Sequence, residues 1–302
     1  MTGLRSALSG ISGILVTPFD SDGRLAPRRL APIVDRAVAA GIHVLVANGN
    51  TGEFYGLATD EAEAMVAAAA GQVAGRVPLL CGVGRALPDA LRLARAAKTA
   101  GADALMVHQP PDPFVAPRGV VEYLRRVGEA ADGLPLVLYL RNDAMGTAAI
   151  AALAAVEGVI AVKWATPNPM RLAEAMAAAD PGIVWVAGLA ETWAPPLYAV
   201  GARGFTSGLI NVWPERSVAI HAALEGGDYE GARRLIATMQ VFEEIRAEEM
   251  NGTNVTAVKA ALALQGLDCG ATRPPSAWPL TPSQMRRLEA FMATHGLAGV
   301  PA

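Results

Sequence analysis

The chain has 302 residues, of which 52% are hydrophobic and 18% charged, so it can form a large core and intrinsic disorder is excluded. The formal net charge of −3 provides no positive field, which excludes nucleic acid and anionic membranes as expected partners and favours a small molecule. Cys81 and Cys269 lie far apart without CxxC spacing, so neither a disulfide framework nor a zinc site is expected. No apolar stretch reaches about 18 residues and no secretory signal is evident, so we expect a cytoplasmic protein.

Short apolar runs alternate with longer Ala-rich amphipathic segments, a pattern typical of parallel strands joined by helices. The predicted strands are 13–19, 43–48, 77–83, 104–108, 135–140, 159–164, 183–187 and 204–207. The predicted helices are 27–40, 59–74, 88–100, 119–131, 147–155, 169–179, 192–200 and 215–224. Thr59 is predicted to cap its helix, and Gly41 and Gly101 to end theirs in the left-handed conformation.

The number of repeats predicts the architecture. Eight strand–helix units of about 25 to 30 residues predict an α/β fold, a closed (β/α)8 TIM barrel, over residues 1–225. No GxGxxG follows the first predicted strand, so an open dinucleotide-binding sheet loses its main support. Residues 226–302 contain three predicted helices, 228–250, 253–264 and 281–295, and are expected to form a C-terminal helical extension packed on the barrel.

One lysine lies in an unusual context. The chain has three lysines, and Lys163 falls inside the apolar strand 159–164. A buried ammonium is costly unless it is paired or deprotonated. A desolvated lysine is the usual amine nucleophile that condenses with a ketone to form a Schiff base. Lys163 is therefore a candidate catalytic residue, with a structural lysine paired to a carboxylate as the alternative.

Two other segments at predicted strand ends carry candidate side chains, where a barrel places its active site. The loop 48–53, Asn-Gly-Asn-Thr-Gly-Glu, could cradle a carboxylate with backbone N–H groups, although turn formation alone would explain its glycines. Glu53 could cap or pair rather than catalyse. Tyr139 ends the strand next to that of Lys163, where its phenol could transfer a proton or simply pack.

Together these segments resemble the dihydrodipicolinate synthase and N-acetylneuraminate lyase family of Schiff-base aldolases and lyases. The resemblance covers most of the chain, through residues 13–23, 50–53, 139, 162–163, 188 and 201–211. It implies that the lysine forms an imine with the ketone of a 2-oxo acid, and that no cofactor or metal takes part. It also implies a homo-oligomer, either a tetramer or a dimer.

The resemblance assigns roles to individual residues of this chain. Lys163 is the Schiff-base residue and Tyr139 the proton-transfer residue. Substrate binding is assigned to Asn50, Thr51, Gly188, Thr206 and Ser207, with Thr51 and its neighbours holding the carboxylate of the 2-oxo acid.

The chain departs from the synthase at three places. Asn50 stands where a hydroxyl residue is usual, segment 108–114 lacks a tyrosine pair, and Ala144 replaces an expected arginine. The 5-dehydro-4-deoxyglucarate dehydratases are more similar, in segments 139–143, 110–111 and 258–259. In that comparison Arg141 is a candidate to bind a distal carboxylate or hydroxyls, and a solvent-facing arginine is the alternative.

The leading hypothesis is therefore a lyase or aldolase that acts on a 2-oxo acid, either of the pyruvate type or a keto-deoxy sugar acid. It would work by dehydration or retro-aldol cleavage through the Lys163 imine. Synthase-like condensation and a non-catalytic member that only binds a 2-oxo acid are the alternatives. The hypothesis of a metal-dependent barrel enzyme has still less support, because only His108 among the four histidines lies at a suitable strand end.

Overall fold

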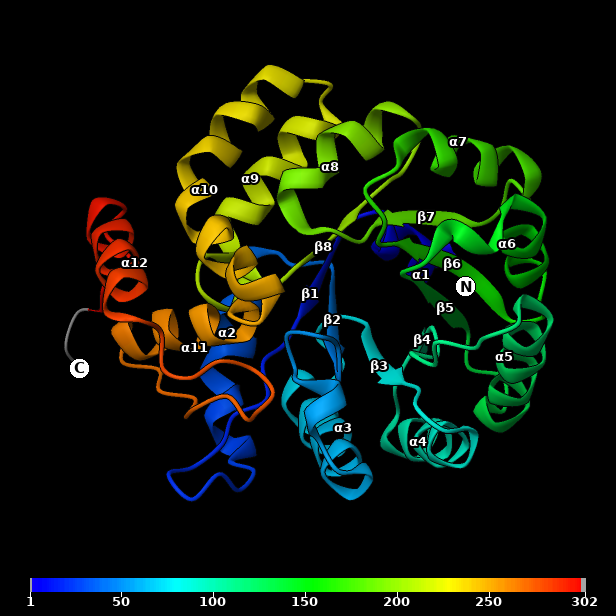
Figure 1. Ribbon diagram of the computed structural model, residues 1–302, viewed down its shortest axis with the longest axis horizontal. Helices are drawn as coiled ribbons and strands as arrows, with labels where there is room; N and C mark the ends of the chain where they lie inside the picture. The colour runs from blue at the N-terminus through cyan, green and yellow to red at the C-terminus, as the bar shows by residue number, and fades with distance from the viewer. Residues whose placement is uncertain (1, 300–302) are drawn as a thin grey trace.

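The computed structural model describes residues 2–299, and its centre is a closed barrel of eight parallel strands (Figure 1). The strands are β1 (Ile11–Ile14), β2 (Val44–Ala47), β3 (Leu79–Val83), β4 (Ala104–His108), β5 (Leu136–Leu140), β6 (Val159–Trp164), β7 (Val184–Ala187) and β8 (Phe205–Ser207). Each strand pairs with the next, and β8 pairs with β1. The predicted (β/α)8 barrel is confirmed.

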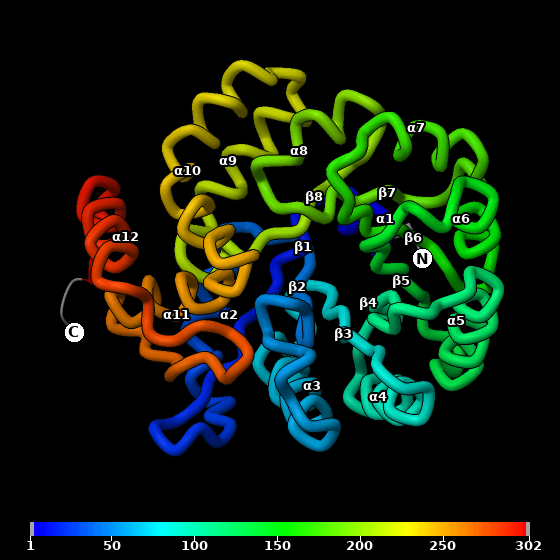
Figure 2. The backbone as a smooth tube through the Cα atoms, viewed as in Figure 1, coloured from blue at the N-terminus to red at the C-terminus, as the bar shows by residue number. Residues whose placement is uncertain are grey.

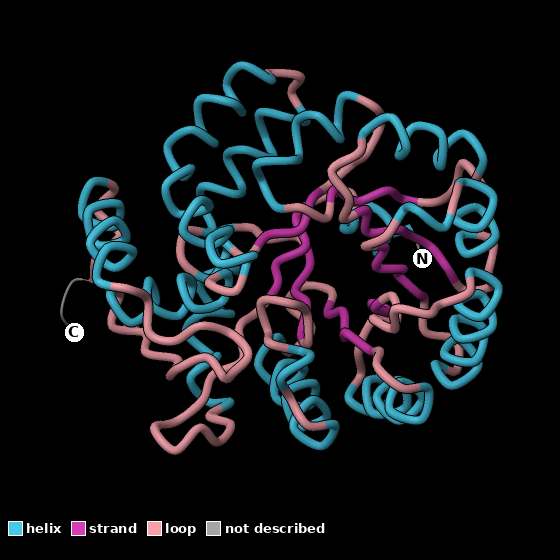
Figure 3. The backbone as a smooth tube through the Cα atoms, in the orientation of Figure 1, coloured by secondary structure: helices cyan, strands magenta, loops and turns pink. Residues whose placement is uncertain are grey.

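Helices surround the strands, as Figure 3 shows. They are α2 (Ala31–Ala40), α3 (Thr59–Val73), α4 (Leu87–Ala100), α5 (Pro117–Ala131), α6 (Thr147–Ala154), α7 (Pro169–Ala178), α8 (Ala190–Ala199) and α9 (Pro214–Glu225). Gly41 and Gly101 end α2 and α4 with φ of 92° and 81°, as predicted for left-handed cap residues. The prediction for Thr59 is wrong: Ala58 is the N-cap of α3, and Glu61 Oε2 accepts the Ala58 N–H at 2.9 Å.

The strands are apolar on both faces because each separates two buried regions. In β5, Val137 and Tyr139 belong to a cluster inside the barrel, whereas Leu136, Leu138 and Leu140 pack against the helices. Successive side chains of a strand point to opposite faces. This alternation directs every second residue toward the barrel axis. At the carboxyl end of β5, where the active site is expected, the inward-facing residue is Tyr139.

Two features of the N-terminal region differ from the prediction. The first strand ends at Ile14, because residues 15–19 leave the sheet and the Phe19 N–H donates to the Cys269 carbonyl at 2.9 Å. A short helix that was not predicted, α1 (Thr2–Leu8), precedes β1, and its Leu8 joins the inner cluster of the barrel. Arg5 Nη1 of α1 donates to the Ile160 carbonyl at 3.1 Å. Helix α1 therefore covers the end of the barrel opposite to the strand carboxyl ends.

The C-terminal helices are α10 (Tyr229–Asn251), α11 (Asn254–Leu264) and α12 (Pro282–Thr294). Helix α10 is interrupted at Glu248–Met250, where the backbone is not helical. Figure 2 shows α11 beside α2 and α12 at the outer edge of the molecule. The segment between α11 and α12 returns to the barrel, where Arg273 forms an ion pair with Glu61 at 2.7 Å. Among the described residues, no helix is both long and apolar enough to span a membrane.

Candidate active site

Lys163 and Tyr139 lie side by side at the carboxyl ends of β6 and β5, where they are paired in register. Both side chains are buried, and Lys163 Nζ lies 3.8 Å from the centroid of the Tyr139 ring. Burial, together with the positive charge of Arg141, lowers the pKa of Lys163 to about 7. No carboxylate within residues 2–299 forms an ion pair with Lys163, so the structure presents a buried amine that is readily deprotonated.

The phenol of Tyr139 is held by Asn50. Asn50 Nδ2 donates to Tyr139 Oη at 2.8 Å, which places the loop after β2 against the end of β5. Burial raises the pKa of Tyr139 to about 12, so the phenol keeps its proton at neutral pH. Tyr139 can therefore donate a proton beside the amine of Lys163 while it accepts a hydrogen bond from Asn50.

His108 extends this row of side chains to a third strand, because it is paired in register with Tyr139. Its Nε2 lies 3.0 Å from the Asn48 carbonyl, and its Nδ1 lies 3.3 Å from Tyr55 Oη. Burial lowers the pKa of His108 to about 3, so the ring is neutral. The carbonyl requires the proton on Nε2, and Nδ1 then accepts a hydrogen bond from Tyr55. Tyr55 was missed by the sequence reasoning, although it follows the 48–53 loop directly.

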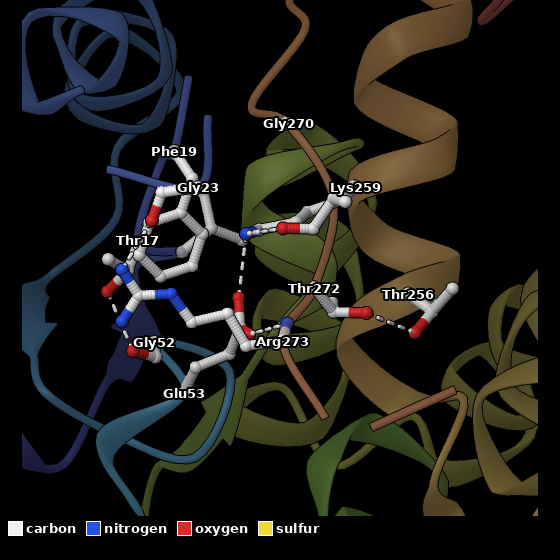
Figure 4. Close-up of polar contacts among 12 residues, drawn as sticks. Thr17, Phe19, Gly23, Gly52, Glu53, Thr256, Lys259, Gly270, Thr272 and Arg273 are labelled. Carbon is white, nitrogen blue, oxygen red and sulfur yellow. Dashed lines mark hydrogen bonds and ion pairs between the residues drawn. The ribbon is translucent and has the colours of Figure 1, made fainter. Parts of the chain in front are cut away.

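The loop after β2 is fixed by an unusual backbone and by contacts with the C-terminal extension. Asn48 and Glu53 both have φ of 56°, and Thr17 Oγ1 donates to the Gly52 carbonyl at 2.7 Å. Glu53 accepts the Arg273 N–H at 3.0 Å and pairs with Lys259 Nζ at 2.7 Å (Figure 4). Of the two alternatives given for Glu53, capping or pairing, the structure shows an ion pair with Lys259. Thr51, in the same loop, is buried.

The residues of β7 and β8 predicted to border the pocket face different directions. Gly188, after β7, donates its N–H to the Trp164 carbonyl of β6 at 2.7 Å. Thr206 is buried and its neighbour Phe205 packs in the outer cluster, so Thr206 faces the barrel axis. Ser207 faces the helices instead, because its Oγ lies 3.1 Å from Ser217 Oγ of α9. The structure brings Thr206 to the inner face of the barrel but not the hydroxyl of Ser207.

Arg141 lies just beyond the end of β5. Its side chain is exposed, and its guanidinium carbon lies 5.9 Å from the centroid of the Tyr139 ring. The N–H groups of Arg141 and Asn142 donate to Gln109 Oε1 at 2.8 and 2.9 Å, which ties this loop to the one after β4. Arg141 therefore places a positive charge at the mouth of the barrel, close enough to act on the pKa of Lys163.

A metal centre is not evident in this arrangement. Within residues 2–299 no three His, Cys, Asp or Glu side chains gather as potential metal ligands. Both ring nitrogens of His108 already have protein partners. The chemistry that the described residues offer is that of an amine nucleophile beside a protonated phenol.

The chain is similar to known proteins along most of its length. A probable 5-dehydro-4-deoxyglucarate dehydratase of Streptomyces avermitilis is 34% identical over 283 residues, which cover 90% of each chain. An uncharacterized DapA-like lyase of Halobacterium salinarum is 33% identical over 96% of this chain and 95% of its own. The crystal structure of a dihydrodipicolinate synthase from Bacillus clausii superimposes with a TM-score of 0.93 at 35% identity, over 97% of this chain and 100% of that one. Because the model of the dihydrodipicolinate synthetase family also matches residues 7–294, the chain belongs to that family and is an enzyme of its lyase class.

Proposed function

We propose that the protein is a Schiff-base lyase for a 2-oxo acid, with Lys163 as the nucleophile. The observation that carries the proposal is the buried amine of Lys163, which pairs with no carboxylate of residues 2–299 and lies 3.8 Å from the centroid of the Tyr139 ring. An amine with a pKa of about 7 is about half deprotonated at neutral pH and can attack, whereas an exposed lysine is almost entirely protonated.

The imine allows two related reactions. Attack of Nζ on the ketone and loss of water give an iminium, which withdraws electrons from the adjacent C3. Removal of a C3 proton forms an enamine that can expel a hydroxyl from C4, with a proton added, as water. Alternatively, loss of the C4 hydroxyl proton breaks the C3–C4 bond and releases an aldehyde. Tyr139 is placed to donate a proton when water leaves and to accept one in return.

We infer that dehydration of a keto-deoxy sugar diacid is the reaction best supported. Several relatives bear the name 5-dehydro-4-deoxyglucarate dehydratase, at 27 to 35% identity. Arg141 supplies a cation at the mouth of the barrel that could bind the second carboxylate of such a diacid. The synthase reaction has less support, because no tyrosine pair follows β4 in residues 108–114.

The test is borohydride trapping followed by intact mass and peptide mapping. Wild type incubated with pyruvate, and separately with 5-dehydro-4-deoxyglucarate, should gain the mass of one reduced adduct on the peptide that contains Lys163. Lys163→Ala should gain none. Lys98→Ala is a matched control, because Lys98 is an exposed lysine of α4, and it should be trapped like wild type. The absence of any wild-type adduct would exclude the Schiff-base mechanism.

The products then separate dehydration from cleavage. Dehydration leaves the carbon chain of the substrate joined at C3–C4, whereas retro-aldol cleavage releases a three-carbon 2-oxo acid that lactate dehydrogenase would detect as pyruvate. We further expect a homo-oligomer, as the family resemblance implies, and a cytoplasmic location, as the sequence predicts. Sedimentation equilibrium would measure the oligomeric state.

A further inference from the structure

The C-terminal extension places a buried arginine beside the predicted carboxylate-binding loop. Arg246 lies in α10 and is only 5% exposed. Gly208, the first residue after β8, is its neighbour on the barrel. A Cβ atom added to Gly208 would lie 2.6 Å from Arg246 Nη2 and 3.0 Å from Thr51 Oγ1. Arg246 Nη2 and the threonine hydroxyl thus both lie close to the side-chain position of residue 208, where a larger residue than glycine would displace one of them.

The neighbours of Gly208 give the direction of its missing side chain. Gly208 lies just after β8 and has a helical backbone, with φ of −90° and ψ of −19°, so the alternation of the strand does not extend to it. Its side-chain position faces the Thr51 hydroxyl of the loop after β2. Arg246 therefore approaches this loop, although it comes from a helix outside the barrel.

The protein does not use all the donors of Arg246. Nη1 pairs with Glu243, and Nη2 donates to Asn254 Oδ1 at 3.0 Å. Nε is buried and has no hydrogen-bond partner within residues 2–299. A guanidinium carries five N–H donors, and a buried donor without a partner is costly. The side chain therefore keeps an unused donor, Nε, while its Nη2 lies close to Thr51.

We propose that Arg246 and Thr51 together bind the carboxylate next to the ketone of the 2-oxo acid substrate. This inference rests on the proposed function, and it identifies the C-terminal extension as a direct contributor to substrate binding. Arginine suits the role because its planar fork of donors matches a carboxylate. Arg141, just beyond the end of β5, then remains available for the far end of the substrate.

The experiment compares two ketones that differ in the carboxylate. Pyruvate carries it and hydroxyacetone does not, and both can be trapped on Lys163 by borohydride. With Arg246→Met, the pyruvate concentration for half-maximal trapping should rise about 10-fold to 100-fold, as expected for a lost charge-assisted hydrogen bond. Hydroxyacetone trapping should be unchanged. Arg246→Lys should recover part of the pyruvate affinity.

A second variant keeps the Arg246 side chain but disturbs its position. Gly208 has φ of −90°, which alanine adopts without backbone strain, and the added methyl group would lie 2.6 Å from Arg246 Nη2, so Gly208→Ala should displace the guanidinium. It should also weaken pyruvate trapping selectively. Arg287→Met is the matched control, because Arg287 lies in α12 and pairs with Glu244 and Glu248 at the surface. It should trap both ketones like wild type.

The outcomes distinguish this inference from the proposed function. Equal losses for pyruvate and hydroxyacetone in Arg246→Met and Gly208→Ala would make Arg246 a structural residue only. Unchanged pyruvate trapping, combined with weaker trapping of the sugar diacid, would assign Arg246 to the distal carboxylate and overturn the inference. Both outcomes can be observed only if wild type forms a trapped adduct. If wild type forms none with any ketone, the proposed function itself fails, and this inference fails with it.

Discussion

Two buried lysines of this protein both lie beside an aromatic ring but differ in their polar partners. Lys163 Nζ lies 3.8 Å from the centroid of the Tyr139 ring, and Lys259 Nζ lies 4.2 Å from that of Phe19. Lys259 is also paired with the carboxylate of Glu53 at 2.7 Å and donates to the Ala271 carbonyl at 3.1 Å (Figure 4). Lys163 has no such carboxylate among the described residues.

The carboxylate decides what each amine can do. Burial lowers the pKa of both lysines, but Glu53 opposes this effect at Lys259 and favours the charged form. Lys259 therefore acts as a cation that connects α11 to the loop after β2. At Lys163 only the positive charge of Arg141 adds to burial, and both favour the neutral amine. An aromatic ring beside a buried lysine is thus compatible with either role, and the anion makes the difference.

Replacing Lys163 should give the largest effect. Lys163→Met keeps the volume of the side chain and removes the amine, so turnover should fall by about 10³-fold or more and no adduct should be trapped. The fold should become more stable at the same time. The pKa of Lys163 is lowered from 10.5 to about 7, so the unfolded chain binds more protons between these values, and wild type gains stability as the pH rises through this range.

Thermal unfolding at two pH values measures this second effect. Lys163→Met should be more stable than wild type by about 1–3 kcal/mol at pH 6, and the difference should shrink toward pH 9. A variant less stable than wild type at pH 6 would contradict the view that the buried amine is held at a cost in stability.

Replacing Lys259 should have the opposite effect on stability. Lys259→Met leaves Glu53 as a buried carboxylate without its cation, which should cost about 3–5 kcal/mol. The double variant Glu53→Gln with Lys259→Met removes both charges and should recover part of this loss. Urea unfolding of wild type and the variants measures the difference. Equal stability of the single and double variants would show that the unpaired carboxylate of Glu53 costs little, and would contradict this explanation.

Replacing the phenol beside Lys163 should have the next largest effect. Tyr139→Phe keeps the ring but removes the proton donor and the acceptor of Asn50, so turnover should fall by about 10²-fold to 10⁴-fold. The imine should still form, more slowly, and remain trappable. Tyr123→Phe is a suitable control, because its hydroxyl only bonds the Arg85 carbonyl, outside the row of His108, Tyr139 and Lys163. Unchanged turnover of Tyr139→Phe would leave Tyr139 with a packing role.

The two lysines also show what sequence reasoning can reach. The repeated alternation of strands and helices predicted the barrel, and strand order then predicted that Tyr139 and Lys163 would be neighbours, because consecutive strands of such a barrel pair. The ion pair of Lys259 joins residues that are distant in the sequence, and no local pattern reports such a contact. The same holds for Arg246 beside Thr51.

Other differences from the prediction have local causes. Helix α1 has only seven residues, too few for a hydrophobic period to be recognised, and it is stabilised by packing on the barrel. At α3, the side chain of Glu61 bonds the backbone of Ala58, so the helix starts without a polar cap residue. Tyr55, close behind the loop that follows β2, reaches His108 of β4 from outside that strand. The spacing of residues along one strand cannot predict a contact that is made by a residue of another segment.

The smallest effect we predict concerns the pH dependence of Lys163 through Arg141. In wild type, pyruvate trapping should become faster as the pH rises through about 7 and level off above it, because only the neutral amine attacks. Arg141→Met removes a like charge near the amine, so the pKa of Lys163 should rise and the midpoint should move to higher pH, by less than about one unit for an exposed cation. Trapping at pH 7 should then be slower.

Two controls test this explanation. Arg171→Met removes an exposed arginine of α7 that is paired with Glu174, and it should leave the midpoint unchanged. Added salt screens exposed charges, so it should move the wild-type midpoint upward and have little effect on Arg141→Met. A midpoint that does not move, or that moves to lower pH, would mean that burial alone sets the pKa of Lys163. The contrast with Lys259 would then depend on the presence of Glu53 and not on the cation near Lys163.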